Sequence, residues 1–218
     1  SYDDFKDIKY DNSFPSKFNY NFMDISIIET LKLQAENDLF ELLDIIQKWD
    51  RKTDIDSQGA GIYGVLYYQL VRNYRNEIQK NNKTVSKEIL LSALADTKAY
   101  IINNFGSIKI TLGVFQKLVR GDKELPIWGL PDVITAMSSR PYKDGKHKVT
   151  QGESYIGLVR FNENGPILES IISFGNSDNP DSEHYTDQME KYSKFQTKKM
   201  TFDKNIIYSQ AKKIYNPN

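Results

Sequence analysis

The sequence predicts an α+β fold in which a mainly helical first half is followed by a strand pair and closing helices. Between residues 37 and 105, apolar side chains recur every three or four positions, which is the period of helices with one buried face. Between residues 154 and 174, β-branched and aromatic residues alternate with polar ones, which is typical of paired strands. Capping residues stand at the ends of several of these segments, so their limits can be placed.

The first predicted elements are an extended arm and a helix. Residues 1–21 carry aromatic side chains among Asp, Asn, Ser and Pro15, and we expect them to be extended and anchored by those rings. The segment Asn37–Trp49 has apolar residues on one helical face, so it is predicted to be a helix with that face buried. The polar residues 50–56 end that pattern.

Two longer helices follow. Ser57 is a suitable N-cap for a helix running to about Ile78, and Gly59 and Gly61 in its first turn allow close approach of another backbone or side chain. Ser86 is predicted to cap a third helix, which ends near Gly106 because glycine readily adopts the left-handed conformation of a helix C-terminus.

After residue 106 the pattern changes. We expect a short helix at Gly113–Val119 and a rigid loop with two prolines at Leu125–Pro131. Two strands are predicted at Ser154–Phe161 and Ile167–Phe174, joined by a turn at Gly165.

The chain is predicted to close with two helices. A turn-rich loop from residue 175 ends at Ser182, a predicted N-cap, and His184–Phe195 is expected to be helical. Asp203 is expected to cap a last helix, Lys204–Lys213. We treat residues 1–218 as one segment of a larger domain, mainly helical in 1–106 and mixed in 107–218.

Composition excludes several classes of function. Lys plus Arg and Asp plus Glu both number 29, so the chain has no net charge to attract nucleic acid or an anionic membrane. Its apolar stretches are too short for membrane insertion. The absence of cysteine excludes disulfides, thiolate catalysis and cysteine-ligated zinc. The chain opens on Ser1 with no signal peptide, which favours a mature or excised fragment.

Three segments carry motifs that point to one family. The first runs from Trp49 to Tyr63 and reads Trp-Asp, then Asp-Ile-Asp-Ser-Gln-Gly-Ala, at the start of a long helix. The second is Gly152-Glu-Ser, which opens a strand. The third, Gly175–Gln188, reads Gly-Asn-Ser-Asp-Asn-Pro-Asp-Ser-Glu-His-Tyr-Thr-Asp-Gln and is the most specific. We call this third segment the His-Tyr box.

In this order and spacing, the motifs resemble the closing part of the penicillin amidase family of N-terminal-nucleophile hydrolases, and they are most similar to its acyl-homoserine-lactone acylase branch. The resemblance covers roughly residues 8–213 and implies the C-terminal section of an αββα sandwich. One segment departs from the pattern. Where many relatives have Trp-Gly-His, this chain has Trp128-Gly-Leu-Pro-Asp, which we interpret as a branch difference.

The resemblance implies a parent enzyme that cleaves a small-molecule amide, such as an acyl-homoserine lactone or a β-lactam side chain. Its nucleophile would be a serine at a newly cut N-terminus with its own α-amine as general base, and an Asn side chain would help to form the oxyanion hole. These parts would lie upstream of this chain. Its partners would then be the α subunit and the N-terminal part of the β subunit, with periplasmic or secreted localisation. No cofactor is expected in this segment, although calcium is implied elsewhere in the parent.

Two residues are candidates for catalysis. Ser1 is an N-terminal serine, but Tyr2 follows it where the family has Asn, and we interpret it as an artificial or proteolytic start. Glu153 matches the acid that orients a histidine behind the nucleophile in some relatives, by accepting its N–H. The alternative is a carboxylate that pairs with Arg160 or a lysine, and both interpretations of Glu153 stay open.

The histidines and the residues of the His-Tyr box have structural interpretations. His184 could be a ligand or proton shuttle, but a packing role with its ring bonded to the preceding loop is preferred. His147 is expected to be a solvated turn residue. Asp187 and Gln188 are expected to hold the loop that starts at Gly175 against the strand pair.

Three aspartates and two tryptophans complete the candidates. Asp50, Asp54 and Asp56 have spacing that partly fits a calcium loop, but helix capping and ion pairing are preferred because the EF-hand glycine and glutamate are missing. Trp49 and Trp128 could border an acyl pocket, and burial in the core is the preferred alternative.

Two alternative functions remain. The chain could be a non-catalytic interaction or scaffold module of the same fold, in which case no in-frame Gly-Ser-Asn-x-Trp would stand upstream. It could also be an unrelated helical protein, which would be favoured if residues 154–174 were not paired strands.

Overall fold

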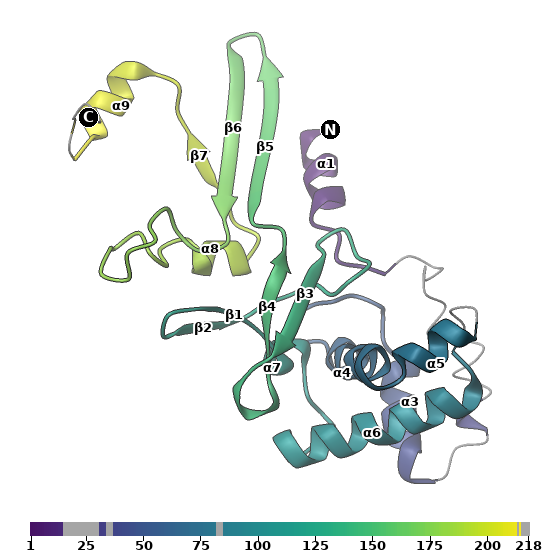
Figure 1. Cartoon of the computed structure of the whole chain (residues 1–218). Coiled ribbons are helices and arrows are strands. Elements are labelled where there is room, and N and C mark those ends of the chain that lie inside the picture. Colours follow the sequence, from purple (N-terminus) through teal and green to yellow (C-terminus); the bar gives the residue numbers. More distant parts are fainter. Residues whose placement is uncertain (15–30, 34–36, 82–84, 213, 215–218) are drawn as a thin grey trace. The chain divides into compact units, whose positions relative to one another are not determined.

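The computed structural model describes residues 1–14, 31–33, 37–81, 85–212 and 214 (Figure 1). They form two compact units, one holding Asp3–Glu153 and the other Ser154–Asn218. None of the helices within the described ranges is both long and apolar enough to cross a membrane.

The first unit begins with a helix rather than the predicted extended arm. α1 (Tyr2–Lys9) has Ser1 as its N-cap, and the Ser1 hydroxyl accepts a hydrogen bond from the amide of Asp4 at 3.2 Å. Acidic residues in its first turn and lysines in its last turn complement the helix dipole. The expectation for residues 1–14 was therefore wrong, and residues 15–21 lie outside the described residues.

The central helix of this unit is α4 (Gln58–Asn73), which begins where the sequence predicted. The Ser57 hydroxyl accepts a hydrogen bond from the amide of Ala60 at 3.1 Å. Nine of its residues are buried, and α4 packs mainly against three other helices. These are α3 (Phe40–Gln47), α6 (Lys87–Phe105) and α7 (Leu112–Phe115).

The boundaries of the helices around α4 agree with the predictions except in details. A 3₁₀ turn, η1 (Asn37–Leu39), precedes α3. The predicted continuation of α4 to Ile78 is interrupted at Tyr74, after which α5 (Arg75–Lys80) begins. α6 is capped by Ser86 and ends at Gly106 with φ +74°, as predicted.

The sequence did not predict the sheet of this unit. Its strand order is β2-β1-β4-β3, and β1 and β4 are parallel. The strands are β1 (Gln116–Arg120), β2 (Lys123–Pro126), β3 (Met137–Pro141) and β4 (His147–Gly152), with a short turn, η2 (Lys143–Gly145), between the last two. The predicted helix Gly113–Val119 is therefore wrong beyond Phe115, and the predicted loop from Leu125 begins inside β2.

The second unit contains the predicted strand pair. β5 (Tyr155–Asn162) and β6 (Gly165–Ile172) form a regular antiparallel hairpin, and β7 (Lys198–Met200) pairs with β6 (Figure 1). This confirms the predicted α+β class and contradicts the alternative of an unrelated helical protein.

The closing helices of the second unit are shorter than predicted. α8 covers only Met189–Ser193, since residues 182–188 form turns. α9 (Lys204–Gln210) is capped by the Asp203 carboxylate, as expected. The end of the predicted last helix, at Lys213, lies outside the described residues.

Candidate functional site

The His-Tyr box forms the loop between β6 and α8 (Figure 1). Gly175 lies so close to the backbone of His184 that a β-carbon at residue 175 would collide with the His184 carbonyl. The same carbonyl accepts a hydrogen bond from the amide of Ser177 at 3.2 Å. The first and tenth residues of the box are therefore in contact, which explains why a glycine is required at its start.

Gln188 attaches this loop to the strand pair. Its Oε1 accepts a hydrogen bond from the amide of Ile172 at 3.3 Å, and its Nε2 donates to Oδ1 of Asn176 at 3.4 Å. Its own amide donates to the carbonyl of Phe174 at 2.8 Å. Gln188 is 3% exposed, so these bonds are shielded from water. The predicted structural role of Gln188 is confirmed.

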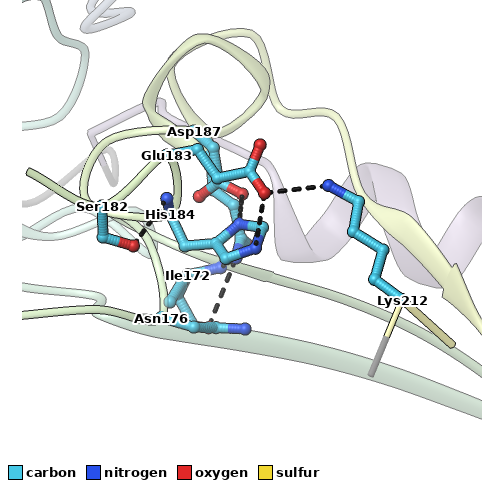
Figure 2. Close-up of polar contacts among 8 residues, drawn as sticks. Ile172, Asn176, Ser182, Glu183, His184, Asp187 and Lys212 are labelled. Carbon is cyan, nitrogen blue, oxygen red and sulfur yellow. Dashed lines mark hydrogen bonds and ion pairs between the residues drawn. The ribbon is translucent and has the colours of Figure 1, made fainter.

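His184 lies on the surface of the box, between two carboxylates (Figure 2). Its Nδ1 is 3.1 Å from Oδ2 of Asp187, and its Nε2 is 3.6 Å from Oε1 of Glu183. Its side chain is 55% exposed. We predicted that the His184 ring would bond the loop that precedes it. That prediction is wrong, since Nδ1 of the ring contacts Asp187, which follows His184 in the chain.

A lysine near the end of the described chain also reaches the box. Nζ of Lys212 is 2.8 Å from Oε1 of Glu183, and this hydrogen bond lowers the pKa of the Glu183 carboxyl (Figure 2). Because both side chains are largely exposed, such an ion pair contributes little to stability. The charged groups of the box therefore contact the chain after α9 on an exposed surface of the loop.

Glu153 stands directly after β4, at the end of the first unit. Its Oε1 is bonded to Nζ of Lys9, and about a fifth of each side chain is exposed. The lysine partner agrees with the structural interpretation of Glu153, and Arg160 takes no part in this ion pair. The contact also holds the carboxylate in a defined, half-buried position, which an orienting acid requires.

The two tryptophans, which the sequence offered as borders of an acyl pocket, pack against other parts of the protein. Trp49 packs against Phe14 and Tyr63 with ring centroids 5.6 and 5.2 Å apart, and Trp128 is 2% exposed. Trp128 is therefore buried, as preferred from the sequence, whereas Trp49 is partly buried and packs against the edge of the core.

The aspartates near the start of α4 also have local partners. Asp50 accepts the amide of Lys52 at 3.0 Å, and Asp54 accepts a hydrogen bond from the side chain of Asn12 at 2.6 Å. Across the described ranges, no three His, Cys, Asp or Glu side chains gather into a set that would hold a metal ion.

His147 is the residue that sequence reasoning placed wrongly. It is 5% exposed and lies at the start of β4, not in a solvated turn. Its ring lies between Tyr68 and Phe115, with both centroids 4.6 Å away, and its Nδ1 is 3.3 Å from Oγ of Ser139. Burial, with a contribution from the Arg72 charge, lowers the pKa of His147 to about 4, so the ring is neutral at pH 7.

The comparison that decides the family concerns almost the whole chain. The family model for penicillin amidase matches residues 1–208. The chain belongs to the penicillin amidase family. The resemblance inferred from the three motifs is thereby confirmed.

Curated relatives of this penicillin amidase family member are considerably longer. It is 40% identical over 88 residues to an acyl-homoserine lactone acylase PvdQ of Pseudomonas syringae pv. syringae (strain B728a), covering 39% of this chain and 11% of the relative. It is 26% identical over 196 residues to a PvdQ of Pseudomonas fluorescens (strain Pf0-1), covering 80% and 25%. The chain thus spans between about a tenth and a quarter of the length of these relatives.

Among solved structures, this family member is similar to a thermostable penicillin G acylase from Alcaligenes faecalis. The TM-score is 0.44 at 14% sequence identity, and the match covers 95% of this chain and 48% of that one.

Proposed function

We propose that this chain is the C-terminal part of an amide-bond hydrolase that removes an acyl group from an amine, such as an acyl-homoserine lactone or a β-lactam with an acyl side chain. The observation that carries the proposal is the family match over residues 1–208. The relatives named acyl-homoserine lactone acylase support the choice of substrate class. In this proposal, the serine nucleophile, its amine and the oxyanion hole lie in the part of the protein that precedes this chain.

Within the chain, we assign Glu153 the role of a positioning residue. Its carboxylate would accept an N–H from a histidine in the preceding part of the protein and fix the tautomer and orientation of that ring. Lys9 supports the assignment because its ion pair holds the carboxylate at the end of β4. An ion pair with a lysine still leaves a carboxylate able to accept further hydrogen bonds.

The test of this role is the variant Glu153→Gln in the complete protein. We expect kcat for a chromogenic acyl-amide to fall about 100-fold, with KM and the melting temperature little changed. Glu163→Gln, an exposed glutamate in the β5–β6 turn, is the matched control and should keep full activity. Full activity of Glu153→Gln would remove Glu153 from the mechanism. A complete protein that hydrolyses no amide would overturn the proposed function itself and favour the scaffold module.

We also propose that the remainder of the precursor covers one face of the β5–β6 hairpin. Tyr155, Val159 and Phe161 alternate along β5, so they share a face, and they are 60%, 51% and 79% exposed. Such a row of large apolar side chains is typical of a surface buried by another layer of structure. By family analogy, the precursor would be exported to the periplasm and cut into two subunits, and any calcium would be bound outside this chain.

The covering of this face can be tested by expressing the chain with and without the preceding part of the protein. We expect the chain alone to be inactive and to self-associate, and to become monodisperse when the preceding part is supplied in trans. Val159→Ser and Phe161→Ser together should weaken that assembly, whereas Lys199→Ser, on β7, should not. A chain that is monomeric by itself and does not bind the preceding part of the protein would contradict the proposed interface.

A further inference from the structure

A cavity of about 270 Å³ lies in the first unit between the helices and the sheet. Six of the side chains around it carry the argument, and they are Val65, Tyr68, Arg72, Tyr100, Phe115 and His147. They come from α4, α6, the end of α7 and the start of β4. Because these elements pack against one another, the positions of the lining side chains are fixed by the fold.

The walls of this cavity are aromatic and aliphatic. The Tyr68 hydroxyl accepts the amide of Ser139 at 2.7 Å, and the Tyr100 hydroxyl donates to the carbonyl of Gly145 at 2.9 Å. Both hydroxyls contact the backbone of the sheet side of the first unit, so the rings offer mainly their apolar surface to the cavity. Val65 and Phe115 are almost completely buried and back the cavity wall with apolar packing, while the partly exposed rings of Tyr68 and Tyr100 form its accessible surface. A site of this kind suits a small apolar group, above all a flat one.

One positive charge stands at the cavity. Arg72, an exposed residue in the last turn of α4, lines it, and its guanidinium forms no ion pair with a carboxylate of the described residues. Arg72 lines the same cavity as His147, and its charge adds to the effect of burial in lowering the pKa of that histidine. His147 adds no positive charge at pH 7, because burial lowers its pKa to about 4, and its Nδ1 lies 3.3 Å from Oγ of Ser139.

We propose that this cavity is a binding site for a small apolar carboxylate, such as an aromatic or short branched acid, with the acid group on Arg72. A guanidinium matches the two oxygens of a carboxylate with two parallel hydrogen bonds. The aromatic rings would cover the apolar part of the ligand. This inference goes beyond the proposed function, because amide hydrolysis does not require such a site and the site would bind its ligand in the absence of turnover.

The test uses the fact that the chain contains only two histidines. The 218-residue chain is isotopically labelled and assembled with the unlabelled preceding part of the protein. Benzoate is titrated into this assembly, and the imidazole resonances of the labelled chain are followed by NMR, with His147→Gln used for assignment. We expect a Kd of about 1 mM or lower. The resonances of His147 should shift, whereas those of His184, in the other unit, should not.

Two comparisons separate this proposal from non-specific binding. Benzamide has the same shape without the charge and should bind about tenfold more weakly, a difference of about 1.4 kcal/mol. Arg72→Gln should abolish that discrimination, whereas Arg75→Gln, an exposed arginine on α5, should preserve it. Equal affinity for benzoate and benzamide in the unmodified chain would overturn the proposal, whether or not the variants fold. Shifts of His184 in place of His147 would overturn it too.

Discussion

Lowering the pH from 7 to 4 is expected to destabilise the first unit by up to about 3 kcal/mol through His147 alone. The folded protein holds the pKa of His147 at about 4, below its ordinary value of 6.5. Between these two pH values the unfolded chain binds a proton that the folded chain does not. The stabilisation is therefore complete above pH 6.5 and is lost progressively as the pH falls towards 4.

This prediction is checked by chemical denaturation at several pH values. Because carboxylates also titrate in acid, the informative quantity is the difference between the chain and its His147→Gln variant. The free energy of unfolding of the variant should fall less steeply between pH 6.5 and 4. His184→Gln is the matched control, since that side chain is half-exposed, and it should follow the unmodified chain. Parallel curves for His147→Gln and the unmodified chain would contradict the predicted burial of a neutral ring.

The second large effect is expected at the start of α4. A β-carbon at Gly61 would lie 2.7 Å from the carbonyl oxygen of Ile110 and 2.7 Å from the carbonyl carbon of Thr111. Both are backbone atoms and cannot turn away, so Gly61→Ala must push α4 from the segment that leads into α7. We expect a loss of about 3 kcal/mol in the free energy of unfolding.

Gly64→Ala on the same helix provides the control. Its added methyl group would meet side-chain atoms of Phe115 and Leu130 at 3.3–3.4 Å, which can adjust by small movements. Alanine also has the higher helix propensity, by about 1 kcal/mol. Gly64→Ala should therefore change the stability much less than Gly61→Ala. Equal losses in the two variants would show that helix packing, and not the backbone contact at Gly61, sets the cost.

The parts of this fold that the sequence predicted are those with local signals. Ser57 and Ser86 begin their helices because their hydroxyls accept hydrogen bonds from amides three residues later, which the sequence shows directly. The β5–β6 hairpin follows from alternation and from the turn at Gly165. The missed helix α1 also had a local signal, the capping box of Ser1 and Asp4, which the aromatic residues around it obscured.

The parts that could not be predicted depend on distant residues. β1 and β4 are short, contain several polar residues and form a sheet only because each finds partners elsewhere in the chain. His147 follows Gly145 and Lys146, a context typical of a turn, yet rings from Tyr68 and Phe115 cover it. The cavity beside it is lined by residues of five separate elements, α4, α6, α7, β3 and β4, so no local sequence pattern indicates it. By contrast, the His-Tyr box was visible as a motif because its residues are consecutive in the sequence, from Gly175 to Gln188, although Gln188 and Glu183 also bond residues outside it.

The parallel pairing of β1 with β4 has a consequence for the order in which the chain folds. The β1–β2 and β3–β4 hairpins join near neighbours and can form quickly, whereas the pairing of Gln116 with His147 closes a much longer loop. That pairing also brings His147 beside Phe115, so the hairpins are joined and the ring is buried in the same step. We therefore expect a slow folding phase that acid slows further, because a protonated His147 must release its proton before this step is complete.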